Sequence, residues 1–423
     1  MFYAAIAVFV LTYILLLLLP KHRAYVALGA AVVFIAMGAM PLSKAPGAIS
    51  WNVIMMIAGT MGMVTLFIDS KMPDRMADML LQKTKSVKMA VVALSVFSGF
   101  ISAFMDNVAT VLIVAPIGLV IARRIGVSPV PVIISISVSS NLQGAATLVG
   151  DTTSIMLGGY AGMDFLDFIV MNGRPGIFWA VELGAAATIP VLLYLFRNEK
   201  GSIEKPDLTQ VEDLFPTFLL VATVVLLISA SFIPNKPEVT NGVICVVLCA
   251  VGLIRSYFRS GNTDLIKKTA KEFDFQTLLL LCGMFIVVGS VTRVGLIDKI
   301  SSFFVWLSGD SLFIVYTIIV FFSVLFSAFI DNIPYVATML PVVQGIAAMT
   351  GSPPYLLYYG LLVGATLGGN LTPVGASANI AGIGILQKNG YDVSTKDFLR
   401  IGLPFTFAAV LVGYVFCWIF WAR

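Results

Sequence analysis

Charged residues are scarce in this chain. Only 11% of its 423 residues are Asp, Glu, Lys or Arg, whereas 59% are hydrophobic, and a soluble domain carries about 25% charged residues. Apolar runs of roughly 17–22 residues recur along the whole length, each long enough to cross a hydrocarbon core of about 30 Å. The composition therefore predicts an all-α integral membrane protein whose main surroundings are the lipid bilayer.

The chain has a single histidine, and its four cysteines form no paired motif. The single histidine, His22, cannot supply the His-Glu-x-x-His site of a metalloprotease, and Leu148 stands where an aspartyl site would need glycine. The cysteines lack zinc-finger spacing and lie in apolar runs, which favours buried free thiols: Cys245, Cys249, Cys282 and Cys417. A net charge of +4 is too small to indicate nucleic acid. We expect neither an enzyme nor a nucleic-acid-binding protein, and no cofactor.

Ten apolar runs are predicted to span the membrane. They are 2–20, 24–41, 51–69, 128–158, 176–196, 215–233, 240–256, 275–292, 354–383 and 401–421. Two further segments, 88–122 and 312–349, each contain two apolar arms separated by an Asp-Asn pair. These segments are interpreted as re-entrant hairpins or as pairs of short spans, and both interpretations give the same topology.

Basic residues concentrate in alternate loops, which orients the chain. The richer set comprises 21–23, 71–88, 123–124, 197–205, 255–271 and 388–400. The positive-inside rule places this set in the cytoplasm and both termini outside. The first run lacks a basic n-region and a cleavage site, so it is predicted to be a retained span. The polar segment 197–214 is predicted to be a solvated cytoplasmic linker between residues 1–196 and 215–423.

The two halves repeat one another. Residues 101–107 read ISAFMDN and residues 326–332 read FSAFIDN, and the same offset of 225 relates Pro116 to Pro341 and Gly150 to Gly375. In the predicted topology the first hairpin enters from the cytoplasm and the second from outside, so the repeats are inverted. Inverted repeats with interrupted helices are typical of secondary transporters, and no selectivity-filter sequence of a channel is present.

The duplicated Asp-Asn pairs are candidates for the transport site. An ionisable residue inside the membrane is costly and marks function by default, which singles out Asp106 and Asp331. Helix capping is the alternative, because Asp is a favoured N-cap. Both roles can coexist, since a helix N-terminus within the membrane also attracts an anion.

Two polar stretches interrupt later spans. NLQGAATLVGDTTS (141–154) and GATLGGNLTPVGASAN (364–379) are rich in Gly, Thr, Ser and Asn, a composition that breaks helices and frees backbone groups to line a cavity. Tight helix packing through small residues is the alternative. Asp151 has Ala376 as its counterpart, which makes it a candidate for cation or proton coupling. Glu182, inside the 176–196 span, could also titrate or serve a structural role.

These motifs resemble the ion transporter superfamily. The similarity is carried by residues 102–117, 141–154, 327–343 and 368–382, and points to the group that holds arsenite permeases, the P protein, sodium/proton antiporters of the D type and citrate-transporter-like permeases. The resemblance implies scaffold and transport domains, elevator-type alternating access and a homodimer. After Asp151 this chain has Thr152, Thr153 and Ser154, where the family commonly has two prolines and an asparagine.

The resemblance also implies which residues bind substrate or ion. They are Asp106, Asn107, Asn141, Thr147, Gly150, Asp151, Thr152, Asp331, Asn332, Asn370, Thr372 and Asn379. A sodium site is expected near Asn141, Thr147, Asn370 and Thr372. We therefore expect a transporter of arsenite, citrate or another carboxylate, coupled to H⁺ or Na⁺ and located in a plasma membrane, with a prokaryotic inner membrane as the expected setting. The alternative is a sodium/proton antiporter.

Overall fold

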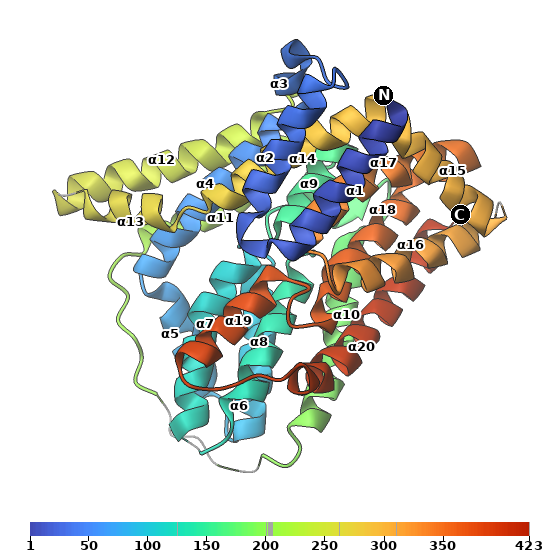
Figure 1. The fold of residues 1–423 in the computed structure, drawn as a ribbon. Helices are drawn as coiled ribbons and strands as arrows, with labels where there is room; N and C mark the ends of the chain where they lie inside the picture. The colour runs from blue at the N-terminus through green and yellow to red at the C-terminus, as the bar shows by residue number, and fades with distance from the viewer. Residues whose placement is uncertain (125, 200, 202–205, 262, 310, 423) are drawn as a thin grey trace.

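The protein is an assembly of helices with one small strand pair. The computed structural model describes residues 1–124, 126–199, 201, 206–261, 263–309 and 311–422. Its first half contains α1 Phe2–Leu18, α2 Arg23–Ala36, α3 Ala45–Ala48, α4 Trp51–Asp69, α5 Met72–Gln82, α6 Val87–Ser102, α7 Asn107–Arg124, α8 Pro129–Gln143, α9 Thr152–Ala161 and α10 Ile177–Leu195. Its second half contains α11 Phe215–Ser231, α12 Thr240–Ser260, α13 Asp264–Glu272, α14 Phe275–Arg293, α15 Leu296–Ser308, α16 Leu312–Ser327, α17 Asn332–Thr350, α18 Pro354–Leu362, α19 Ser377–Lys388 and α20 Thr395–Trp421 (Figure 1). Strands β1 Val170–Met171 and β2 Arg174–Pro175 form an antiparallel pair between α9 and α10.

The helical membrane class agrees with the composition, but the number of spans differs from ten. Among the described residues, 6 helices are long and apolar enough to cross a membrane, or up to 8 if each of two bent pairs is one span. Helices α1 and α2 have 17 and 14 residues and are bent by 113° at their junction. At 1.5 Å per residue they reach about 25 and 21 Å, less than the hydrocarbon thickness of about 30 Å.

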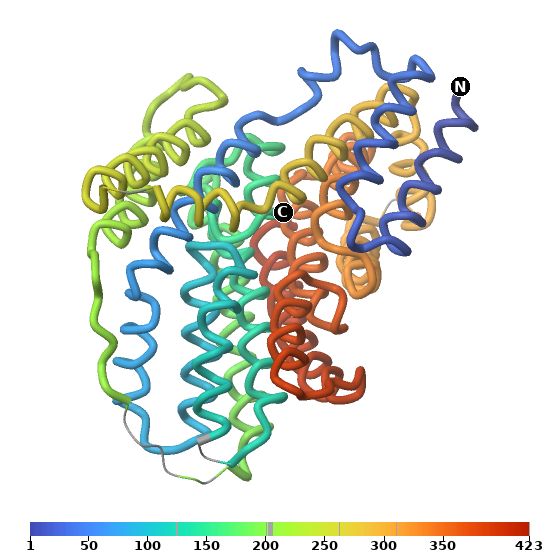
Figure 2. The backbone as a smooth tube through the Cα atoms, turned by 60° about the vertical axis from the view of Figure 1, so that its left-hand side comes forward, coloured from blue at the N-terminus to red at the C-terminus, as the bar shows by residue number. Residues whose placement is uncertain are grey.

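The repeat found in the sequence is visible in two matching helix crossings. Helix α4 packs along α12, and α14 packs along α2. A Cβ added to Gly59 would lie 2.4 Å from the carbonyl carbon of Cys245, and one added to Gly283 would lie 2.6 Å from that of Ala27. Each crossing therefore depends on a glycine that lets two backbones touch. Figure 2 shows α1 and α2 in blue and α11 to α13 in yellow-green on opposite sides of the molecule.

The segments predicted to be hairpins are pairs of helices that meet at the Asp-Asn motifs. Helices α6 and α7 are joined at residues 103–106, and α16 and α17 at residues 328–331. The polar stretches that follow separate α8 from α9 and α18 from α19. Helix α19 packs on α7 and α8, and α9 packs on α17. Each half of the chain thus supplies one helix to the hairpin region of the other half.

The described part of the predicted linker is attached to the protein. Residues 200 and 202–205 of this segment lie outside the described residues. Farther along, the amide and hydroxyl of Thr209 donate to Oδ2 of Asp78 at 2.9 and 2.6 Å, and Gln82 donates to the Pro206 carbonyl at 3.0 Å. Residues 206–209 therefore lie along α5, while the side chains of Asp207 and Leu208 are exposed, which is compatible with the predicted solvated linker.

Candidate functional site

One cavity is lined by the first residues of four helices, which come from both repeats. Its volume is about 410 Å³, within the roughly 300–1,000 Å³ typical of small-molecule sites. Helices α7, α9, α17 and α19 contribute their first residues, and α4 and α14 complete the wall. The lining includes Asp106, Asn107, Asn141, Asp151, Thr152, Asp331, Asn332 and Ser377. Four helix N-termini carry partial positive charge toward one space.

Three of the four helices begin with an aspartate cap. Oδ2 of Asp106 accepts from the Ala109 amide at 2.9 Å, and Oδ1 of Asp151 accepts from the Thr152 amide at 2.7 Å. Oδ1 of Asp331 accepts from the Ile333 amide at 3.3 Å. Helix α19 has Ala376 at the equivalent place and no side-chain cap. Capping and cavity lining thus occur together, and the α19 N-terminus keeps uncapped amides.

Each polar break is tied to the hairpin of its own repeat in the same way. The hydroxyl of Thr147 donates to the Ala103 carbonyl, and that of Thr372 donates to the Ala328 carbonyl. A Cβ on Gly150 would meet the carbonyl oxygens of residues 144, 103 and 102 at 2.6 to 2.9 Å. One on Gly375 would meet those of residues 369, 327 and 328 at 2.5 to 3.0 Å. Glycine is required because the break lies directly on the hairpin backbone.

An asparagine chain joins the repeats, beginning at the cavity wall with Asn107 and Asn141. Asn107 donates to Oδ1 of Asn141 at 3.2 Å, and Asn141 donates to Oδ1 of Asn370 at 3.0 Å and to the Thr366 carbonyl at 2.7 Å. Asn370 in turn donates to the Val138 carbonyl at 3.0 Å. These amides are fully engaged within the protein, and Thr147 and Thr372 are engaged at the breaks. Of the residues expected to hold sodium, Asn141 and Asn370 connect the two halves, whereas Thr147 and Thr372 hold each break to the hairpin of its own repeat.

The remaining predicted residues support the second break. Asn379 donates to the carbonyls of Gly369 and Thr372 at 3.1 and 3.3 Å. The amide of Asn332 lies against Ser327 and, with its nitrogen as donor, reaches the carbonyls of Ala365 at 3.1 Å and Gly375 at 3.3 Å. Asn332 lines the cavity, whereas Asn379 lies behind it.

The structure adds a cation that sequence reasoning assigned to a cytoplasmic loop. Nη1 of Arg23 lies 2.7 Å from Oδ2 of Asp331, and the side chains are 16% and 8% exposed. The same carboxylate oxygen accepts from Ser377 Oγ at 2.9 Å. Ser377 could have been found, because it follows Ala376 as Thr152 follows Asp151. Arg23 carried no such signal, since 308 residues separate it from Asp331.

Acidic residues dominate the cavity wall. Glu272 and Asp274, at the end of α13 and the start of α14, join Asp106, Asp151 and Asp331. No Lys or Arg lies in the described lining. Asp274 is an exposed N-cap residue: it accepts from the Thr277 amide at 3.0 Å at the start of α14 and also borders the cavity. Ile68, Glu272 and Asp274 lie near the ends of α4, α13 and α14 that adjoin loops predicted to be cytoplasmic.

Known proteins match this chain over most of its length. The model of the citrate transporter family matches residues 13–364 and 265–423. The chain belongs to this family. It is therefore a secondary transporter and not an enzyme. An uncharacterized transporter of Mycobacterium bovis is 30% identical over 429 residues, covering 98% of this chain and 97% of that protein. The human P protein is 24% identical over 447 residues, covering 86% of this chain and 53% of that protein, which agrees with the predicted group.

Two solved transporters share the fold. The YdaH transporter of Alcanivorax borkumensis, described as having an unusual topology, has a TM-score of 0.61 at 14% identity and covers 95% of this chain and 98% of its own. Neisseria gonorrhoeae MtrF, described with a class of antimetabolite efflux pumps, has a TM-score of 0.59 at 14% identity, covering 92% and 84%. At this identity the likeness concerns the fold alone.

Proposed function

We propose that this family member moves a small anion, a carboxylate such as citrate or an oxyanion such as arsenite, with a coupling cation. The observation that carries the proposal is the convergence of four helix N-termini on one cavity of about 410 Å³. Helix N-termini attract anions, and this volume is far larger than a bare sodium ion needs. The family's name supports a carboxylate over arsenite.

The aspartates are proposed to hold the coupling H⁺ or Na⁺. Asp106 and Asp151 line the cavity, and the described residues contain no ion pair to either carboxylate. A carboxylate inside the membrane is stabilised by binding a proton or a metal cation. Neutralising these two groups would also lower the electrostatic cost of bringing an anion beside them.

We propose elevator-type alternating access. Helices α1, α2, α4, α11, α12 and α14 would form the scaffold, and the hairpins, the broken helices, α10 and α20 would move together. Support comes from the packing of α10 on α20, α6 and α8, and of α20 on α8 and α18. We further propose a homodimer in the plasma membrane.

A sodium/proton antiporter is the second candidate, and the acidic wall favours it. Five carboxylates without a lining cation attract cations more strongly than anions. In that case Asp106, Asp151 and Asp331 would be ligands of the exchanged ion, and the N-terminal dipoles would serve only to stabilise their charges.

Proteoliposomes separate the two candidates. Radiolabelled citrate, another dicarboxylate or arsenite would be offered under a sodium or proton gradient, and a trapped pH dye would report the response to sodium alone. Saturable anion uptake that requires the gradient supports the first proposal. A sodium-triggered pH change without uptake of any anion contradicts it and supports the antiporter. Protein-free liposomes and the Asp106→Asn variant serve as controls.

A further inference from the structure

The two repeats differ where a scaffold helix pair meets a hairpin tip. We call residues 19–23 the first elbow, between α1 and α2, and residues 232–239 the second elbow, between α11 and α12. The first elbow reaches the second hairpin, because Arg23 is paired with Asp331 and Tyr13 of α1 donates to the Pro334 carbonyl at 2.8 Å. The equivalent tip residue, Asp106, faces the cavity and has no ion-pair partner among the described residues.

The helix crossings fix which positions of the elbows correspond. Gly59 meets the backbone of Cys245, and its counterpart Gly283 meets that of Ala27. This register relates Arg23 to Asn241, at the start of α12. The second elbow has its own cation five residues earlier, at Lys236. Each elbow therefore carries a basic side chain that is paired with an aspartate of the proposed moving part: Arg23 with Asp331 and Lys236 with Asp164.

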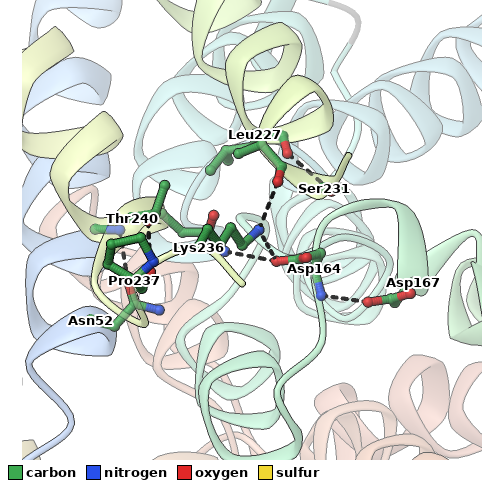
Figure 3. Close-up of polar contacts among 11 residues, drawn as sticks. Asn52, Asp164, Asp167, Leu227, Ser231, Lys236, Pro237 and Thr240 are labelled. Atoms are coloured by element: carbon green, nitrogen blue, oxygen red, sulfur yellow. Dashed lines mark hydrogen bonds and ion pairs between the residues drawn. The ribbon is translucent and has the colours of Figure 1, made fainter. Parts of the chain in front are cut away.

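The second elbow presently holds a different acidic partner. Lys236 is ion-paired with Asp164, beyond the end of α9, and also donates to the Ala230 carbonyl at 3.1 Å (Figure 3). Asn241 lies 3.4 Å from the same Asp164 oxygen. The Lys236 and Asp164 side chains are 15% and 25% exposed. Asp164 belongs to the segment proposed to move, so this pair also joins scaffold to moving part.

Alternating access in an inverted repeat exchanges the roles of the halves. A contact that one repeat makes in the state described here is therefore expected to be made by the equivalent residues of the other repeat when the cavity is open to the opposite side. The first elbow now closes on the second hairpin, so the related contact joins the second elbow to the first hairpin. The long, flexible lysine side chain gives the second elbow the reach that arginine gives the first.

We propose that Arg23 and Lys236 are alternating counter-ions of the hairpin aspartates. Arg23 neutralises Asp331 in the state described here. When the cavity opens on the opposite side, Lys236 leaves Asp164 and pairs with Asp106, while Arg23 releases Asp331. One hairpin carboxylate is then masked in each state, and the other is available to the coupling cation. The inference rests on the alternating access proposed above and does not depend on the identity of the substrate.

Cysteine cross-linking in the full-length protein tests the exchange. In a background with Cys245, Cys249, Cys282 and Cys417 replaced by alanine, one variant carries Arg23→Cys with Asp331→Cys. The second carries Asp106→Cys with Lys236→Cys. A protease site inserted in 197–214 reports each cross-link, because both pairs join the two halves. A bifunctional thiol reagent is needed, since a direct disulfide requires Cα atoms within about 7 Å.

We expect both pairs to hold the halves together in membranes after denaturation and cleavage. Varying sodium, pH and citrate should lower the 23/331 cross-link whenever the 106/236 cross-link rises. A control pair, Arg23→Cys with Lys236→Cys, also joins the two halves and should release them throughout, because the two elbows belong to helix pairs on opposite sides of the molecule. Absence of the 106/236 cross-link under every condition overturns the proposal, as does a parallel rise of both pairs.

Measuring flux in the cysteine-free parent distinguishes failure of the counter-ion exchange from failure of the proposed function. If the parent transports neither anion nor cation, the transport assignment fails whatever the cross-links report. If the parent transports and the 106/236 pair never forms, only the counter-ion exchange fails.

Discussion

At the scale of single residues, the hairpin aspartates combine a structural with a chemical role. Asp106 and Asp331 cap α7 and α17 through backbone amides and also line the cavity. Asparagine can still cap a helix but cannot bind a cation by charge or pair with arginine. We expect Asp106→Asn and Asp331→Asn to insert and fold, with flux reduced on the order of tenfold or more.

This prediction is checked by measuring flux at equal amounts of folded protein in the membrane. The matched control is Asp298→Asn, because Asp298 is an exposed residue of α15 away from the cavity lining. Wild-type flux in both hairpin variants would contradict this prediction and would mean that the two aspartates act only as helix caps. Loss of folded protein in either variant would show that capping alone needs the charge.

The duplicated motif predicted these aspartates because an intramembrane carboxylate stands out against apolar neighbours. The partner of Asp331 could not be predicted in the same way. Arg23 lies in a short basic cluster with Lys21 and His22, a pattern that indicates a cytoplasmic loop. Only the 113° bend between α1 and α2 brings this cluster toward the second hairpin, and a bend of that kind depends on tertiary packing.

At the scale of elements, the two polar breaks are held by close backbone contact. Gly150→Ala and Gly375→Ala would place a Cβ within 3.0 Å of backbone oxygens that side-chain rotation cannot move. We expect each substitution to lower the free energy of unfolding by about 1–3 kcal/mol and to reduce flux. Thermal unfolding in detergent, followed by intrinsic fluorescence, measures the effect.

Gly384→Ala is the control for these variants, because a Cβ there meets nothing within 4 Å. Alanine is also the better helix former by about 1 kcal/mol, so this variant should unfold at the same temperature or higher. Equal behaviour of all three variants would contradict the proposed contact between break and hairpin.

The composition of the two polar breaks predicted that the helix would be interrupted between α8 and α9 and between α18 and α19, because Gly, Thr and Asn weaken helices in lipid. The lengths of α1 and α2 could not be predicted from composition. Runs 2–20 and 24–41 are apolar enough to span, yet Leu19 to His22 turn the chain before either helix reaches full length. Hydropathy reports a preference for lipid but not the depth at which a chain bends.

At the scale of the whole molecule, the asparagine chain is one of the polar connections between the halves. Asn141 and Asn370 each bond to one another and to a backbone carbonyl of the opposite repeat. We expect Asn141→Ala or Asn370→Ala to cost about 1–3 kcal/mol, because each leaves buried partners unsatisfied. The double variant should cost less than the sum, since the second change removes a group already unpaired.

A double-mutant cycle on unfolding free energy measures this coupling. Additive costs would contradict a direct connection and would mean that the two residues stabilise their own repeats separately. The repeat itself was predicted from the register of ISAFMDN and FSAFIDN. The contact between Asn141 and Asn370 could not be predicted in this way. Internal similarity shows which positions of the two copies correspond, but it does not show where the two copies touch.

The replacement of Asp151 by Ala376 in the second repeat has an electrical consequence. The proposed moving group carries Asp106, Asp151 and Asp331, whereas Arg23 and Lys236 belong to the proposed scaffold. A charge crossing the whole field gains or loses about 2.3 kcal/mol per 100 mV. Under the proposed elevator motion, an interior-negative membrane potential would therefore drive the empty carrier outward. Cation binding removes that bias, so the resting voltage helps to recharge the transporter between cycles.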